Sequence, residues 1–393
     1  MNRKEIITVS LVSIAVILLL DLLTNSLDTT RNVWDFVYYI SMAKDGLNAE
    51  PLASPFAYRF LIPGLVNLLS RTGLSIESGF KLIAYIGAFT QLTGIFLFVR
   101  WLGRSSRGAW IALLVTAFSL FNVKFLIFDP FRPDHLAYAL ILLQTYFALK
   151  RKFLPLLLLT LIGSMLREFT LIPIFAYIFM LTREKVERSI IIQQGIISLV
   201  LILLAMILPR IWIPVTESYQ LIDLSANGLL YAIVLPFIPS FPVNFIFSIL
   251  AYFLPLFLLV SPKEVRFAVQ ELPESQRWYL AGYTILVLLL SFFGGTDYNR
   301  FATFLFLPQV MLLGTLENKV TNQKLIIVLA CLFIFNRLWM YFPDWDIQTY
   351  RNFYGGFALQ LNIHTLYRIL ELAGFIFIGY FLHRRGILNN SQM

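Results

Sequence analysis

Long apolar segments separated by short polar breaks recur along the whole chain. A helix needs about 20 apolar residues to cross the hydrocarbon core of a bilayer, and the longer segments reach that length. The pattern therefore predicts an all-α protein, a polytopic transmembrane helical bundle of about 12 spans with a range of roughly 10–13. The predicted spans are 5–25, 79–100, 108–128, 135–149, 153–166, 169–182, 189–209, 243–260, 278–294, 301–316, 325–341 and 364–382.

The breaks between these segments are short, with one exception. Residues 26–78 form the longest connection, and they follow the first apolar segment directly. That first segment has a basic start, contains Asp21 and lacks a small-residue cleavage site, so we expect a retained signal-anchor span. No Pro/Ser-rich linker interrupts the chain. We therefore expect a single transmembrane domain over residues 1–393 and no soluble domain.

Composition agrees with a membrane protein. Hydrophobic residues make up 59% of the chain and charged residues 13%, with a mean hydropathy of +0.76. A soluble chain carries roughly 25% charged residues. The net charge of +9 does not indicate nucleic-acid binding, because the basic residues fall in alternate connections. The positive-inside rule makes that side cytoplasmic and places both termini there. Short loops and the lack of retention signals favour a bacterial plasma membrane.

The other connections carry charge of both signs. Ionisable groups at this depth are costly in lipid and usually face a protein interior or a wet cavity. Such a set predicts one cavity at the external face. Its members are Asp35, Asp45, Arg59, Asp129, Arg132, Asp134, Arg167, Glu168, Asp297, Arg300, Arg337 and Arg368.

The connection 26–78 has an unusual pattern for a loop. In "WDFVYYISMAKDG", Asp35, Tyr38, Tyr39 and Met42 have helical spacing. Three prolines then divide the chain, and "SPFAYRFLIP" carries Arg59 at the entry to another apolar helix. We expect short interfacial helices in this first external loop. The alternative is an amphipathic loop with aromatic anchors and no further role.

Three stretches resemble one enzyme class. They are "YY" followed by "SPFAYRFLIPGL", the region from "FRPDHLAYAL" to "REFTLIP", and "GGTDYNRFATFLFLP". In order and topology they are similar to the GT-C class of integral membrane glycosyltransferases, which use polyprenyl-phosphate sugars. The resemblance implies a GT-C-like fold, a catalytic acid in the first external loop and a lipid-linked sugar donor. It puts Asp35 at the catalytic position and makes Asp45 a weaker candidate.

Elementary chemistry assigns roles to the remaining residues. A carboxylate such as Asp35 can act as a general base toward an acceptor hydroxyl. The leaving group is a phosphate, which the planar fork of arginine binds bidentately. Arg59, Arg167 and Arg300 are the phosphate candidates, in that order. The complete predicted substrate-binding set is Arg59, Tyr39, Asp45, Arg132, Asp134, Arg167, Glu168, Asp297 and Arg300.

Several of these residues also have plain structural interpretations. Arg167 and Glu168 fit a buried ion pair that orients two short helices. Asp297 and Arg300 fit a pair at a helix start, where an acid is favourable. "DPFRPDH" fits a proline-stiffened turn, with Asp134 as the first acid of the next helix.

The sequence contains few motifs that would indicate a cofactor or another class of function. The three His are scattered, Cys331 is the only cysteine, and no zinc-type motif occurs. We expect no cofactor or bound metal, although external acids leave a divalent cation open. The expected partners are a polyprenyl-phosphate-linked sugar, an unidentified glycan, lipid or protein acceptor, and the bilayer. The alternatives are a transporter or flippase of a lipid-linked glycan, with charges near the midplane, and an O-antigen-type polymerase or ligase.

Overall fold

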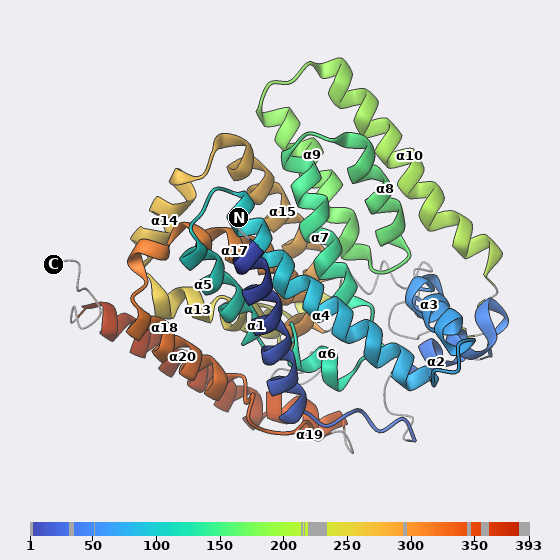
Figure 1. Ribbon diagram of the computed structural model, residues 1–393, viewed down its shortest axis with the longest axis horizontal. Coiled ribbons are helices and arrows are strands. Elements are labelled where there is room, and N and C mark those ends of the chain that lie inside the picture. Colours follow the sequence, from blue (N-terminus) through green and yellow to red (C-terminus); the bar gives the residue numbers. More distant parts are fainter. Residues whose placement is uncertain are drawn as a thin grey trace.

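The computed structural model describes residues 3–30, 35–50, 52–213, 215, 217–218, 234–293, 297–343, 347–354 and 361–384. Within these ranges the chain is almost entirely helical, and one two-residue strand pair is the described β structure. This confirms the predicted all-helical class. Figure 1 shows the helices gathered side by side into one bundle.

The α-helices follow the apolar pattern closely. They are α1 (Arg3–Leu22), α2 (Phe36–Asp45), α3 (Leu61–Ser70), α4 (Ile76–Trp101), α5 (Ser106–Ala117), α6 (Lys124–Phe128), α7 (Asp134–Leu149), α8 (Phe153–Ser164), α9 (Ile172–Arg183), α10 (Arg188–Trp212), α12 (Ser240–Tyr252), α13 (Leu254–Leu259), α14 (Pro262–Glu271), α15 (Glu274–Phe293), α16 (Tyr298–Phe301), α17 (Phe306–Thr315), α18 (Asn322–Phe335), α19 (Ile347–Tyr354) and α20 (Ile363–Arg384).

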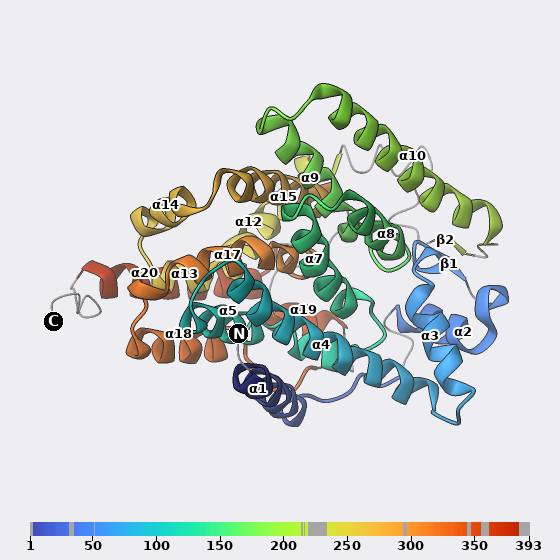
Figure 2. The same ribbon diagram turned by 45° about the horizontal axis from the view of Figure 1, so that its top comes forward.

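Short elements connect these helices. The 3₁₀ turns are η1 (Gly46–Asn48), η2 (Phe56–Tyr58), η3 (Glu168–Leu171), η4 (Leu235–Phe237), η5 (Ala302–Leu305) and η6 (Glu317–Lys319). Strand β1 (Ala53–Ser54) pairs in parallel with β2 (Glu217–Ser218). This pairing brings the chain after α10 to the first long connection, beside α2 and α3 (Figure 2).

Each predicted span contains a helix, but four are divided. The segment 301–316 passes from α16 through η5 to α17, and 169–182 passes from η3 to α9. The segment 108–128 is split into α5 and α6 by the turn at 118–123, and 243–260 is split into α12 and α13 before Pro255. Four helices, α1, α4, α10 and α15, are long and apolar enough to cross a membrane. These four helices are compatible with a helical membrane protein, and the number of crossings stays a prediction. Helices α2 and α3 lie in the connection 26–78, and their interfacial position stays a prediction.

Small residues let the central helices approach closely. A Cβ added at Gly87 of α4 would lie 2.6 Å from Cδ2 of His135 on α7, and Leu142 of α7 lies over Gly94. His135 is completely buried by this contact. Helices α4 and α7 thus form the packed centre that supports the residues around the start of α7.

Helix α10 has the opposite character. Leu199, Leu203, Ile207 and Trp212 are exposed large hydrophobic residues on it. Figure 1 shows α10 at the edge of the bundle. An apolar helix that packs so little of its surface against protein is typical of one that faces lipid.

The connections segregate to two ends of the bundle. One end, called the basic end, gathers the alternate basic connections. Its contacts are Arg100 with Glu5 at 3.6 Å, Arg107 with the carbonyl of Val320 at 2.6 Å, Arg151 with Glu184 at 2.9 Å and Lys150 over the ring of Trp101. These contacts join several of the connections that the basic residues predict to lie on one side. Which membrane side this end faces stays a prediction.

Candidate functional site

Charged residues from distant parts of the chain meet at the end opposite to the basic end. Asp134 lies at the centre of this charge network and is completely buried. Its Oδ1 is 3.0 Å from Nε of Arg167, and its Oδ2 is 3.4 Å from Nε of Arg300. Arg300 also reaches Asp297 at 3.1 Å. One carboxylate thus connects the start of α7, the turn before η3 and α16.

Arg59 joins the first long connection to η3. Its Nε and Nη2 donate to both oxygens of Glu168, at 2.9–3.2 Å. Its Nη1 donates to the hydroxyl of Tyr39 at 3.4 Å, and Tyr39 is buried on α2. Arg167 lies 4.0 Å from Glu168 and so connects this pair to Asp134. Arg59 is therefore fully engaged within the protein.

Arg132 forms the third part of the network. Its Nε donates to Asp129, and its Nη2 lies 3.4 Å from the carboxylate of Asp35. Arg132 also lies within electrostatic range of Asp297. Asp35 therefore contacts this guanidinium group, and Asp297, which is far from it in sequence, is close enough to interact with the group electrostatically.

Local sequence explains why these residues stand at element ends. Asp35 is the residue before α2, Asp134 is the first residue of α7, and Asp297 is the residue before α16. Acids are favourable at helix N-termini because of the helix dipole. Arg167 is extended before η3, where Gly163 allows Thr170 to pack against α8. The starts of three helices therefore bring these carboxylates to the charge network.

Burial divides the network into a floor and a rim. The floor consists of Asp134, Arg167 and Arg300, whose side chains are at most 5% exposed. The rim consists of Asp35, Glu168 and Asp297, whose side chains are 22%, 36% and 43% exposed. A polar molecule that approaches this end meets the rim carboxylates first and the buried guanidinium groups behind them.

The rim carboxylates differ in their protonation. Burial raises the pKa of Glu168, but the positive charges of Arg59 and Arg167 outweigh it and hold that pKa at about 2. Burial raises the pKa of Asp297 to about 6, although Arg132 and Arg167 lower it. Glu168 is therefore an anion at any physiological pH, whereas Asp297 takes up a proton in mildly acidic solution.

Most of the predicted site residues come together. Tyr39, Arg59, Arg132, Asp134, Arg167, Glu168, Asp297 and Arg300 join Asp35 in the network. Asp45 does not join it: this residue is exposed at the far end of α2 and forms no ion pair among the described residues. The predicted set of substrate-binding residues lacked Asp129, a completely buried partner of Arg132. Its spacing of three residues from Arg132 was the available signal.

The structure agrees with some of the purely structural roles that the sequence suggests for these residues and differs from others. Asp297 and Arg300 do pair across one turn, and Asp134 does begin α7. Arg167, however, pairs more closely with Asp134 than with its neighbour Glu168. No cluster of three or more His, Cys, Asp or Glu with metal-binding geometry occurs among the described residues. The connection 210–230, which the pattern of basic residues predicts on the external side, lies mostly outside the described residues.

Comparisons of the chain with protein-family models, curated proteins and solved structures found no match.

Proposed function

We propose that this protein is an integral membrane glycosyltransferase of the GT-C type. It transfers a hexose-type sugar from a polyprenyl-phosphate carrier to an acceptor at the external face, in a bundle of about 12 spans. The observation that carries the proposal is the position of Asp35. This carboxylate directly precedes the short helix α2 of the first long connection, at the rim of a network with buried arginines behind it.

The reaction is a single displacement with inversion. Asp35 accepts the proton of the acceptor hydroxyl, whose oxygen forms the new bond to the anomeric carbon. The bond from that carbon to the phosphate oxygen breaks, and the electron pair leaves with the polyprenyl phosphate. The products are the glycosylated acceptor and the free carrier.

The phosphate requires a guanidinium group with donors to spare. Arg59 is a poor candidate because Glu168 and Tyr39 occupy its fork. Arg300 is a better one: its Nε and Nη1 have no partner of hydrogen-bond geometry among the described residues. Buried donors without good partners are costly, and phosphate oxygens match the arginine fork. We therefore assign the main phosphate contact to Arg300, with Arg167 beside it.

Two aspartates at opposite ends of α2, Asp35 just before it and Asp45 at its last residue, allow a matched test. Release of free polyprenyl phosphate is measured from a panel of polyprenyl-phosphate sugars, with a crude acceptor extract. Membranes carry the wild-type chain, Asp35→Asn or Asp45→Asn. We expect Asp35→Asn to slow release by about 10²–10⁴-fold, the effect of a lost general base. Asp45→Asn should match the wild type, since Asp45 is exposed and lies outside the network.

Equal rates of polyprenyl-phosphate release by the two variants would contradict the role of Asp35 as general base. Wild-type membranes that behave like empty membranes across the whole panel would contradict the transferase itself. Movement of a lipid-linked glycan across the membrane would then be the better proposal, and it would be measured directly.

A further inference from the structure

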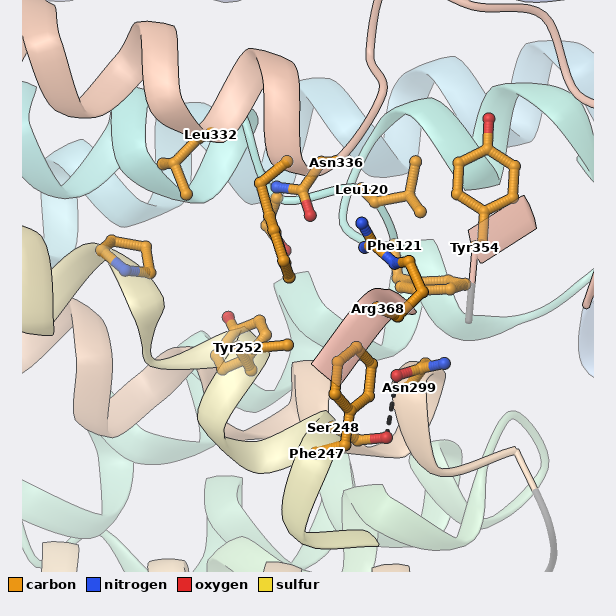
Figure 3. Close-up of a pocket in the computed structure, with 14 residues that line it drawn as sticks. Leu120, Phe121, Phe247, Ser248, Tyr252, Asn299, Leu332, Asn336, Tyr354 and Arg368 are labelled. Atoms are coloured by element: carbon orange, nitrogen blue, oxygen red, sulfur yellow. Dashed lines mark hydrogen bonds between the residues drawn. The ribbon is translucent and has the colours of Figure 1, made fainter. Parts of the chain in front are cut away.

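A polar pocket separate from the charge network is lined in part by α16, the helix that carries Arg300. Six helical segments and the turn after α5 surround it, and Figure 3 shows their side chains arranged around one space. Arg368 of α20, Asn336 beyond α18 and Asn299 of α16 supply polar groups. The space measures about 40 Å³, which is room for roughly three waters. It therefore suits one small polar group.

Arg368 carries an excess of buried positive charge. It is 5% exposed, and it donates to Glu371, which also accepts from Arg337 at 3.0 Å. Two guanidinium groups thus share one carboxylate in the described part of the chain. Nε of Arg368 has no hydrogen-bond partner among the described residues. A buried cation needs a counter-charge, and among the described residues this site has two guanidinium groups for one carboxylate.

The rest of the pocket can hold an oxyanion without repelling it. The hydroxyl of Tyr252 is a polar group of the lining, whereas the amide nitrogen of Asn336 already donates to the carbonyl of Phe118. No acidic side chain lines the pocket among the described residues. Phe121, Phe335 and other aromatic rings form its walls, and Arg368 stacks over Phe335 at 4.3 Å. Apolar walls strengthen a charge–charge contact by excluding water.

Helix α16 connects this pocket to the charge network. Asn299 lines the pocket, while the next residue, Arg300, contacts Asp134. Ser248 of α12 fixes Asn299 with a hydrogen bond of 2.8 Å (Figure 3). A molecule that is anchored in the pocket would thus contact the same short helix that carries the arginine we assign to the donor phosphate.

We propose that Arg368 binds an oxyanion of the acceptor, a phosphate or a carboxylate, in this pocket. Arginine pairs with both groups through its planar fork. The assignment to the acceptor rests on the proposed transferase function, whereas oxyanion binding itself does not. The acceptor would be an anionic molecule, such as a phosphorylated glycan or lipid.

The test measures binding of inorganic phosphate to the full-length protein in a zwitterionic detergent. Thermal unfolding is followed against phosphate concentration, with chloride keeping the ionic strength constant. We expect a saturable rise in the midpoint for the wild type. For Arg368→Gln we expect binding weaker by about 10- to 100-fold, the effect of losing a hydrogen bond from a charged group.

Arg337→Gln is the matched control, because Arg337 shares Glu371 with Arg368 but does not line the pocket. Each variant leaves Glu371 with one arginine, so their losses of stability should be similar. Arg337→Gln should retain phosphate binding. Equal phosphate binding by the two variants would overturn the proposal. So would a wild type that binds neither inorganic phosphate nor the phosphatidic acid used below as a second probe.

A second probe identifies the source of the oxyanion. The same variants are placed in phosphatidylcholine nanodiscs with and without phosphatidic acid. Stabilisation by phosphatidic acid alone, dependent on Arg368, would assign a lipid headgroup; stabilisation by phosphate would assign a group on a soluble acceptor. Asp35→Asn should bind both probes like the wild type. If the wild type releases no polyprenyl phosphate but still binds a probe through Arg368, the transferase function is contradicted. The proposed oxyanion-binding pocket is then still supported.

Discussion

The floor and the rim of the charge network contain the same residue types in different surroundings. In the floor, Asp134 is completely buried between Arg167 and Arg300. On the rim, Asp35 is 22% exposed and faces Arg132. Removing one partner of a buried ion pair leaves an uncompensated charge, whereas an exposed pair contributes little. The floor should therefore contribute more to stability than the rim, whose carboxylates are exposed enough to meet an approaching molecule.

The largest expected effect tests the floor. Asp134→Ala leaves two buried guanidinium groups without their shared carboxylate, so we expect a loss of about 3–5 kcal/mol in the free energy of unfolding. Asp35→Ala, on the rim, should lose about 1 kcal/mol or less. Denaturant unfolding of both variants in detergent measures the difference. Similar losses at the two positions would break the distinction between floor and rim.

A smaller effect is expected where packing positions the floor. In Gly163→Ala the new methyl group would lie 2.4 Å from Oγ1 of Thr170, which follows Arg167 and Glu168 in η3. Overpacking of this kind costs about 1–3 kcal/mol. Gly195→Ala on α10 is the control, because nothing lies within 4 Å of its Cβ position. If Gly163→Ala unfolds at the same midpoint as the wild type, the close contact does not constrain η3.

The smallest effect concerns the pH dependence of one rim carboxylate. The pKa of Glu168 is lowered to about 2 in the folded protein, from about 4.3 in an unfolded chain. Its contribution to stability is therefore complete above the unfolded pKa and is lost as pH falls toward 2. We expect the difference in unfolding midpoint between wild type and Glu168→Gln to be constant from pH 8 to about 5, then to shrink. A difference that grows in acid would contradict this ion pair.

Much of the fold was predictable because apolar length and helix propensity are local properties. The twelve apolar segments all contain helices, and α7 and α16 begin at the acids that the pattern indicated. The breaks inside 108–128 and 243–260 were not predicted, since an apolar run has the same composition whether one helix or two pass through it. Pro255 marked the second break; Lys124, buried in the first, binds two backbone carbonyls of distant segments.

The site was predictable as a set of residues but not as a set of partners. Charged residues in an apolar chain stand out, so Asp35, Arg59 and Arg300 were found without a structure. The sequence could not show that Glu168 occupies Arg59, or that Asp134 serves two arginines. Partner choice depends on which connections meet at one end of the bundle, and the packing of helices far apart in the chain decides that.

The sequence alone determined that this protein is helical and apolar enough for a membrane, where its helices lie, and which charges are expensive to bury. These properties depend on side-chain chemistry and on distances of a few residues along the chain. The tertiary structure decided that Arg59 is saturated, that Arg300 and Arg368 keep donors without good partners, and that Asp35 lies on an exposed rim. Hydrogen-bond geometry and burial arise only when distant segments pack together, because each depends on atoms that the local sequence does not contain.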